Sequence, residues 1–255
     1  MTRPPQPDTD AGRSAVDTVM AILGSFDEHH RVMGVREISR RAGIPKSSVH
    51  RTVGQLLAHG ALERRGAGVQ VGVRLFELGT LAPTQATLRD AALPFAHHLS
   101  EFTRLTVNLA VREGSQIVYL EKISQAAHRI PHTRLGGRGD VHATGLGKAL
   151  LAFSPEHEID DVLAAPLRAL TPHTLVDPVA LRAELAEIRA RRVAFDLEES
   201  SPGLFCVAAP ILDAGARPIA AISVTGATTR RQVEEHAGSL RTAALAISRA
   251  AAGAR

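Results

Sequence analysis

The stretch IPKSSVHRTV, residues 44–53, combines two cations, two serines and a histidine with apolar residues. Side chains of these types can hold phosphate oxygens and can hydrogen-bond the edges of DNA bases. The polar residues concerned are Lys46, Ser47, Ser48, His50 and Arg51. A solvated helix face could carry the same residues, so the charges and elements around the stretch must decide between the two interpretations.

The positive charge of the chain is concentrated around this stretch. The 255 residues carry a net charge of +4, and seven cations stand against two acidic residues between positions 36 and 65. The remainder of the chain is therefore close to neutral. Outside the stretch, the cations that we expect to meet DNA are Arg36, Arg64 and Arg65. Such clustering favours a polyanionic partner.

A second segment, HATGLGKA, contains the Gly-Lys pair of a phosphate-binding loop. That loop requires a glycine five positions before Gly147 and a serine or threonine after Lys148, but the chain has His142 and Ala149 there. Nucleotide binding is therefore not expected. Gly145 either lets the backbone approach a ligand at a helix start or only forms a tight turn.

Two further features could contribute to a site. Cys206 is the single cysteine, so no internal disulfide is possible, and its apolar run GLFCVAAP favours a buried, inert thiol over a nucleophile. In residues 219–226 the alternation of a strand places Ala221, Ser223 and Thr225 on one face. These small and hydroxyl side chains could line a cavity or could bond to neighbouring backbone.

No metal ion, cofactor or membrane is expected. Pro131 argues against a helix that would bring His128 and His132 together, and the histidine pairs at 29–30 and 97–98 lack ligands at suitable spacing. The polar N-terminus does not resemble a secretory signal, and no run approaches the ~20 apolar residues that span a bilayer. We therefore expect a cytoplasmic protein.

Three helices are predicted around the basic stretch. The first follows a capping residue, Ser14, and the second covers residues 35–42 and ends at Gly43. The third begins at Pro45, whose missing N–H costs nothing in a first turn, and runs to about His59. Its apolar residues recur at i, i+4, i+7 and i+8, which buries one stripe and leaves the polar residues outside it.

A small basic hairpin follows these helices. Residues 61–65 and 69–73 form two extended runs around the glycine turn GAG. Three helices followed by such a hairpin form a winged helix-turn-helix, which we assign to residues 12–73 after a disordered tail over 1–11. This arrangement favours DNA binding over a merely solvated helix face.

Residues 74–83 are predicted to form a linker helix, and residues 84–255 a second domain. The helices predicted there cover residues 88–100, 145–153, 156–164, 178–191 and 230–251. The predicted strands cover 105–112, 116–123, 128–134, 192–197, 204–211 and 218–225, with a glycine-rich loop at 136–139. Adjacent strands joined by tight turns imply an antiparallel sheet with helices packed on it, so the chain is of the α+β class.

Nearly the whole chain resembles the IclR-type bacterial transcriptional regulators. The resemblance lies in GIPKSSVHR, in HATGLGKALLAF, in the acidic pair Glu198–Glu199 and in GLFCVAAP. It implies a winged-helix DNA reader, a linker helix and a GAF-like effector domain, assembled as a homodimer or a dimer of dimers. It also implies a regulator and not an enzyme, with double-stranded, near-palindromic operator DNA as its partner. We expect a repressor more than an activator.

The resemblance further implies an effector pocket. By motif match, its residues fall on Gly145, Leu146, Asp196, Cys206, Ser223 and Thr225. Effectors of the family are small keto, hydroxy or aromatic acids. Backbone N–H groups at Gly145 suit a carboxylate, whereas Asp196 would repel one unless it faces a ligand hydroxyl. The expected effector is therefore a small carboxylic acid that carries a hydroxyl or carbonyl group.

Overall fold

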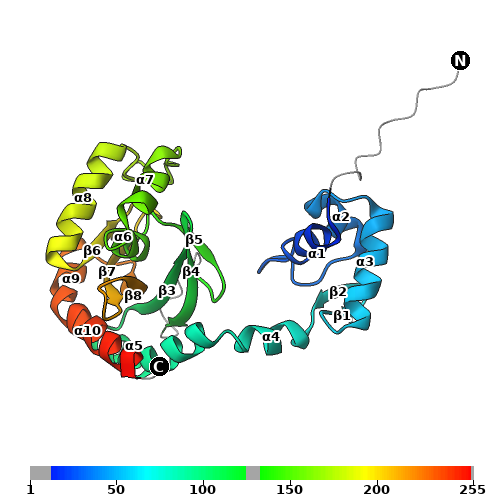
Figure 1. Ribbon diagram of the computed structural model, residues 1–255, viewed down its shortest axis with the longest axis horizontal. Helices are drawn as coiled ribbons and strands as arrows, with labels where there is room; N and C mark the ends of the chain where they lie inside the picture. Colours follow the sequence, from blue (N-terminus) through cyan, green and yellow to red (C-terminus); the bar gives the residue numbers. More distant parts are fainter. Residues whose placement is uncertain (1–12, 125–132, 254–255) are drawn as a thin grey trace, which may run out of the picture. The chain divides into compact units, whose positions relative to one another are not determined.

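The computed structural model describes residues 13–124 and 133–253, and the chain divides into two compact units, Met1–Pro83 and Thr84–Arg255 (Figure 1). We call them unit 1 and unit 2. The predicted tail over 1–11 and the pair His128 and His132 lie outside the described residues. Each unit has its own hydrophobic core, because the buried cluster of unit 1 shares no residue with the two buried clusters of unit 2.

Unit 1 has the predicted winged helix-turn-helix architecture. Its elements are α1 (Ala15–Leu23), α2 (Val35–Ala42), α3 (Lys46–Ala58), β1 (Leu62–Arg65), β2 (Gly68–Val71) and α4 (Val73–Thr80). The second hairpin strand is shorter than predicted, since Val73 begins α4. Gly72 ends the hairpin by donating to the Ala61 carbonyl, and a Cβ atom on Gly72 would lie only 2.2 Å from the Gly60 carbonyl oxygen.

Local signals explain the helix ends in unit 1. Ser14 and Asp17 form a capping box at the start of α1, in which each side chain accepts a hydrogen bond from the other residue's backbone N–H. Gly43 ends α2 in the left-handed conformation, with φ of 63°. Pro45 caps α3, as its fixed φ allows. These ends place α3 directly after the turn that follows α2.

Unit 2 contains an antiparallel sheet with helices on both faces. Its helices are α5 (Pro83–Thr103), α6 (Gly145–Leu151), α7 (Glu156–Ala164), α8 (Pro178–Arg191), α9 (Arg230–Glu235) and α10 (Ala237–Gly253). Its strands are β3 (Thr106–Glu113), β4 (Gln116–Ile123), β5 (Arg138–Asp140), β6 (Ala194–Leu197), β7 (Phe205–Leu212) and β8 (Pro218–Gly226).

The strand order β5-β4-β3-β8-β7-β6 brings distant parts of the sequence together. The β3–β4 and β7–β8 hairpins meet at the centre of the sheet, where Asn108 of β3 lies opposite Ser223 of β8. Helices α5, α9 and α10 cover one face, and α6, α7 and α8 cover the other (Figure 1). The residues of β3, β7 and β8 that point toward α6 are therefore available to form a site.

Several predicted elements of unit 2 differ in the structure. The glycine-rich loop predicted at 136–139 overlaps strand β5, which is only three residues long and pairs with β4. The strand predicted at 128–134 lies largely outside the described residues, and Thr133 and Arg134 belong to no strand. The helix predicted from 88 begins earlier, at Pro83.

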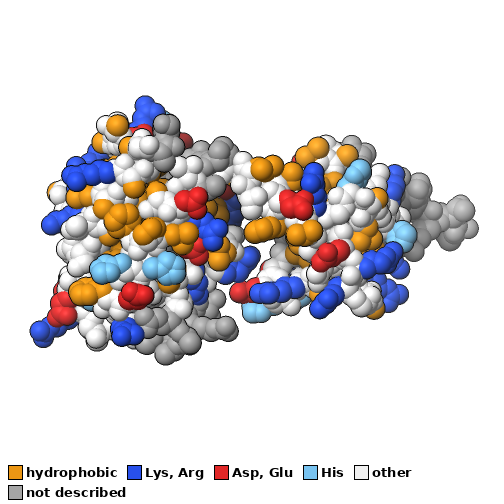
Figure 2. Space-filling view, turned by 90° about the horizontal axis from the view of Figure 1, so that it is seen from below, with side chains coloured by type: hydrophobic (Ala, Val, Ile, Leu, Met, Phe, Trp, Pro, Cys, Tyr) orange, Lys and Arg blue, Asp and Glu red, His pale blue; other side chains and the backbone are white. Residues whose placement is uncertain are grey.

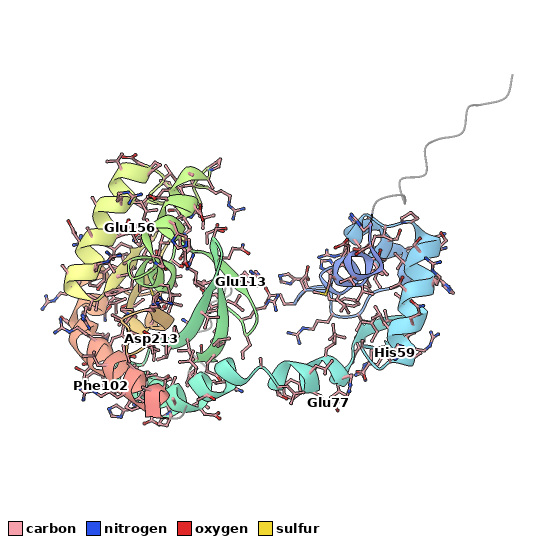
Figure 3. All side chains as sticks on the ribbon, in the orientation of Figure 1. His59, Glu77, Phe102, Glu113, Glu156 and Asp213 are labelled. Atoms are coloured by element: carbon pink, nitrogen blue, oxygen red, sulfur yellow. The ribbon has the colours of Figure 1, made fainter. Side chains whose placement is uncertain are left out.

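The helix predicted at 230–251 is divided at His236. The N–H of His236 bonds to the carbonyl of Val233, three residues back, which tightens the chain between α9 and α10. The His236 ring also meets Phe102 edge-on, with 6.0 Å between the ring centroids; Figure 3 shows Phe102 near the end of α5. This contact fixes the junction against α5.

Candidate functional site

The outer face of α3 presents the polar residues of the basic stretch. Lys46, Ser47, His50 and Arg51 are exposed and Ser48 is half-buried. The opposite face is buried in the core of unit 1 through Val49, Thr52, Val53 and Leu56. Thr52 is the one of these four that the apolar pattern does not predict. The polar residues are held outward because their helix is fixed by its buried side.

Two of the seven cations between residues 36 and 65 have structural roles. Arg40 pairs with Glu37 at 2.5 Å, and Arg41 pairs with Asp27 and donates to the Ser25 carbonyl at 2.8 Å. The other five cations are exposed, and among the described residues none of them forms a hydrogen bond or ion pair. They are Arg36, Lys46, Arg51, Arg64 and Arg65. These five guanidinium and ammonium groups are free to contact phosphates.

The hairpin that carries Arg64 and Arg65 is fixed to the helices. Met33 and Val69 exchange two backbone hydrogen bonds of 2.9 Å, which tie β2 to the segment before α2. A shallow hollow of about 130 Å³ lies between α3 and this hairpin, and both His50 and Arg64 line it. Helix α3 and the hairpin therefore border one hollow, to which α3 contributes His50 and the hairpin contributes Arg64.

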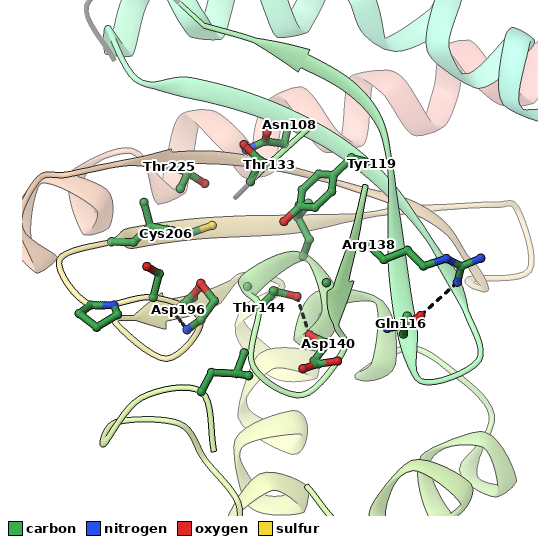
Figure 4. A pocket seen from close by; sticks show the side chains of 18 of the residues that line it. Asn108, Gln116, Tyr119, Thr133, Arg138, Asp140, Thr144, Asp196, Cys206 and Thr225 are labelled. Atoms are coloured by element: carbon green, nitrogen blue, oxygen red, sulfur yellow. Dashed lines mark hydrogen bonds between the residues drawn. The ribbon is translucent and has the colours of Figure 1, made fainter. Parts of the chain in front are cut away.

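Unit 2 contains a pocket of about 570 Å³ on the α6 face of the sheet (Figure 4). Its polar and sulfur-containing lining residues are Asn108, Gln116, Tyr119, Thr133, Arg138, Asp140, Thr144, Arg168, Asp196, Ser200, Ser201, Cys206 and Thr225. The remaining lining residues are Gly139, Gly145, Leu146, Leu170, Pro202 and Leu204. A cavity of this size with converging polar groups is typical of a small-molecule site.

The start of α6 forms one wall of this pocket. Thr144 caps the helix, since its hydroxyl accepts from the Gly147 N–H and donates to the Asp140 carbonyl. A Cβ atom on Gly145 would lie 3.1 Å from the Cys206 sulfur, and one on Gly147 only 2.3 Å from the Val141 carbonyl oxygen. Both glycines therefore allow close packing, and Gly145 does so at the pocket wall.

Asp196 is buried at the pocket, but its carboxylate is already engaged. One oxygen accepts from the backbone N–H groups of Glu199 and Ser200, at 2.7 and 3.1 Å, and the other accepts from the Ser200 hydroxyl at 2.5 Å. Burial raises the pKa of Asp196, and the hydrogen bonds from Ser200 and Glu199 oppose that rise. The carboxylate thus holds the loop that carries Ser200, Ser201 and Pro202 into the pocket wall.

Cys206 lacks the surroundings of a nucleophile. Burial, followed by the nearby Asp196 carboxylate, raises the pKa of the Cys206 thiol to about 12. Burial also raises the pKa of the Tyr119 hydroxyl. No histidine is among the described residues that line the pocket. A thiol that stays protonated and has no adjacent base is unsuited to nucleophilic catalysis.

A buried ion pair joins α6 to the loop that Asp196 holds. Lys148 of α6 is only 2% exposed, and its Nζ lies 2.5 Å from Glu199 Oε1 and 3.8 Å from Glu184. The hydroxyls of Thr171 and Thr174 donate to the carbonyls of Glu198 and Glu199. Helix α6 and the loop that carries Glu198 and Glu199 are therefore held together by an ion pair, and two threonine hydroxyls bond to the same loop.

Within the described residues, no helix has the length and apolarity to cross a membrane, and no three His, Cys, Asp or Glu residues gather as metal ligands would. Family comparison identifies both units. Residues 15–66 match the IclR helix-turn-helix domain, and residues 81–249 match the bacterial transcriptional regulator IclR C-terminal domain. The chain belongs to the IclR family.

Known members of the IclR family align with most of the chain. The HTH-type transcriptional regulator XynR of Escherichia coli is 33% identical over 242 residues, which cover 92% of this chain and 96% of XynR. The transcriptional repressor IclR of Escherichia coli is 32% identical and aligns with 83% of this chain and 79% of its own length.

A similar solved structure was determined with a bound ligand. It is an IclR homologue from Microbacterium hydrocarbonoxydans in complex with 4-hydroxybenzoate, with 30% identity and a TM-score of 0.88. The alignment covers 94% of this chain and all of that one. The chain is thus a DNA-binding transcriptional regulator with a C-terminal effector-binding domain.

The pocket contains five of the six effector residues that the IclR resemblance implies. Ser223 is not among its lining residues; it is fully buried, 3.5 Å from the Asn108 amide nitrogen and 3.4 Å from the Thr225 hydroxyl. Sequence reasoning misses Asn108, Tyr119 and Thr133. Asn108 did leave a signal, because an amide in the apolar strand TVNLAV needs a polar partner on one face of the sheet.

Proposed function

We propose that the protein is a repressor whose operator binding is controlled by a small organic acid in the unit 2 pocket. The observation that carries this proposal is the pocket itself, a polar cavity of about 570 Å³ in the effector-binding domain of an IclR-family regulator. The relative named transcriptional repressor IclR supports the repressor role. The 4-hydroxybenzoate complex supports an organic acid as the ligand.

For the DNA contact, we propose that α3 lies in the major groove and the hairpin along the backbone. Ser47, Ser48 and His50 would reach base edges from the N-terminal half of α3. The five unpaired cations would hold phosphates: Arg36, Lys46, Arg51, Arg64 and Arg65. Their exposure and lack of intramolecular partners support this assignment.

For the assembly, we propose that α4 mediates a homodimer. None of its residues is buried, although Val73, Phe76 and Leu78 are large and apolar, and the adjacent Leu81 is 72% exposed. In Figure 2, which is seen from below the view of Figure 1, hydrophobic side chains are exposed on the surface of the segment that contains α4. A helix with exposed apolar residues on several sides is unstable in water and needs a partner surface. Two paired units would match two half-sites of a near-palindromic operator.

A DNA-binding experiment tests this proposal. Genomic fragments that the protein selects are used in electrophoretic shift assays at several salt concentrations. Arg51→Ala should weaken binding and lower the slope of log affinity against log salt by about 1, because one phosphate contact is lost. Arg249→Ala, on the exposed face of α10 in unit 2, is the matched control and should change neither quantity.

The same fragments test the effector. In a panel of keto, hydroxy and aromatic acids, at least one should change operator affinity by tenfold or more. Thr225→Leu, which adds volume at a lining position, should abolish that response without weakening DNA binding in the absence of acid. If no acid alters operator affinity, the effector part of the proposal is wrong. An unchanged affinity in Arg51→Ala would refute the DNA-contact part.

A further inference from the structure

Two buried polar atoms in the pocket wall have no partner. Among the described residues, the buried side-chain atoms without a hydrogen bond are Asn108 Oδ1, Thr133 Oγ1 and Glu199 Oε2. Asn108 and Thr133 both line the pocket, and they are only 1% and 7% exposed. Buried polar atoms are almost always hydrogen-bonded in folded proteins, so two such atoms in one cavity wall indicate a missing partner within the cavity.

The two residues lie at the same end of the pocket. Lys122 is the neighbour of Asn108 across the β3–β4 pair, and the Lys122 ammonium donates to the Thr133 carbonyl at 2.6 Å. Figure 4 shows Asn108, Thr133 and Thr225 together at one end, with Asp140 and Thr144 at the opposite end. We call the Asn108 and Thr133 pair the inner polar pair.

The chemistry of the inner polar pair selects its partner. The Asn108 amide nitrogen is directed at the Ser223 hydroxyl, 3.5 Å away, and Ser223 in turn contacts Thr225, which leaves the amide oxygen toward the cavity. That oxygen can only accept a hydrogen bond, whereas the Thr133 hydroxyl can donate or accept. A ligand hydroxyl satisfies both, because it donates to Asn108 and accepts from Thr133. A ligand carboxylate has no proton to give to Asn108.

We propose that the inner polar pair is a hydroxyl-recognition subsite, so that the effector is a hydroxylated carboxylic acid whose hydroxyl lies between Asn108 and Thr133. The carboxylate then lies toward the other end of the pocket, away from the amide oxygen. This inference rests on the proposed effector function and makes it more specific: Asn108 discriminates hydroxylated acids from the corresponding acids that lack the hydroxyl.

Paired ligands test the proposal by calorimetric titration of the full-length protein. The pairs are 4-hydroxybenzoate with benzoate, 3-hydroxybenzoate with benzoate, and lactate with propionate. In at least one pair the hydroxylated acid should bind at least ten times more tightly than the acid without the hydroxyl. Without that hydroxyl, two buried polar atoms of the protein stay unpaired. Asn108→Leu and the nearly isosteric Thr133→Val should each reduce that preference at least fivefold, while the acid without the hydroxyl binds as before.

Thr242→Val is the control variant, because the Thr242 side chain is exposed on α10 and is not among the residues that line the pocket. It should retain the preference for the hydroxylated acid. If acids bind but both members of every pair bind equally, or if Thr133→Val and Asn108→Leu keep the full preference, the subsite is refuted and the effector function stands. If no acid of the panel binds, the effector function and the subsite both fail.

Discussion

Single residues at the pocket show how burial sets chemical reactivity. Cys206 and Asp196 lie opposite each other on β7 and β6, and burial shifts the pKa of each toward the uncharged form. The raised pKa of Cys206 keeps its thiol protonated. In Asp196 the rise in pKa is opposed by the hydrogen bonds through which the carboxylate holds a loop. Residues that resemble catalytic groups in the sequence therefore shape a binding wall in the structure.

Cys206 should react slowly with iodoacetamide in the native protein. A thiol with a pKa of about 12 is almost entirely protonated at pH 7.5, and the side chain is buried. The matched control is a Val179→Cys, Cys206→Ser double variant, because Val179 is 77% exposed on α8. Mass spectrometry should show labelling of the control at least ten times faster. Rapid labelling of native Cys206 would contradict the buried thiol and revive a nucleophilic role.

Asp196 should make the protein less stable as the pH rises. Its pKa is higher in the folded protein than the ordinary value near 4, so the folded state binds its proton more tightly. That contribution to the free energy of unfolding is complete below about pH 4 and is lost as the pH rises through the folded-state pKa. Between pH 4 and 7, the free energy of unfolding measured in urea should decrease less in Asp196→Asn than in the wild type.

The exposed carboxylate of Asp161 on α7 provides the comparison for this pH series. Asp161→Asn should reproduce the wild-type pH dependence. If Asp196→Asn and Asp161→Asn behave alike, ionisation of Asp196 has no influence on stability.

At the scale of elements, the glycines of α3 and α6 have opposite roles. A Cβ atom on Gly54 would meet nothing within 4 Å, so this glycine only adds flexibility to α3. Gly147 lies against the backbone of Val141 and cannot accept a side chain without movement. Gly54 therefore makes α3 more flexible, whereas Gly147 allows α6 to pack closely against Val141.

Gly54→Ala should raise the free energy of unfolding of unit 1 by ~0.5–1 kcal/mol, because alanine loses less backbone freedom on entering a helix. Gly147→Ala should lower the free energy of unfolding of unit 2 by about 1–3 kcal/mol, because the added methyl group overpacks the contact with Val141. Denaturant unfolding of both variants measures the two effects. Equal effects of the two substitutions would show that packing around these glycines does not govern stability.

Elements with strong local signals are predictable from the sequence, and those set by strand pairing are not. Helix α8 agrees with its prediction, because Asp177 caps it and Pro178 begins it. Strand β5 is missed because Arg138, Gly139 and Asp140 have no strand pattern and extend only by pairing with β4. Family motifs locate Gly145 and Cys206 at the pocket.

The inner polar pair is beyond such prediction. Asn108 becomes a pocket residue because β3 pairs with both β4 and β8, a strand order that depends on the whole sheet. Ser223 illustrates the same limit: its face of the strand is predicted, but in the structure it contacts Asn108 and Thr225 and is not among the lining residues.

For the whole molecule, the apolar residues of α4 decide the assembly that we propose. Phe76 is 72% exposed and central to this helix, in which Arg74 and Glu77 form an ion pair; Figure 3 labels Glu77. Phe76→Glu should weaken dimerisation by at least about 2 kcal/mol, since it places a charge in an apolar contact. Sedimentation velocity at several concentrations measures the change.

Val179→Glu, at an equally exposed position on α8, is the matched control for Phe76→Glu and should leave the sedimentation unchanged. A dimer that persists in Phe76→Glu would place the contact on other elements. Weaker operator binding should accompany loss of the dimer, because each half-site then binds alone.

The separate hydrophobic cores of the two units have a thermodynamic consequence. No buried residue is shared between the core of unit 1 and those of unit 2, so unfolding of one need not entail unfolding of the other. A differential scanning calorimetry trace of the whole chain should then contain two heat-absorption peaks. Operator DNA should stabilise unit 1, and an effector acid should stabilise unit 2. Each ligand should therefore move the peak of the unit that binds it to a higher temperature. If the two sites are coupled, a ligand should also move the peak of the unit that does not bind it. The size of that second displacement measures the coupling free energy.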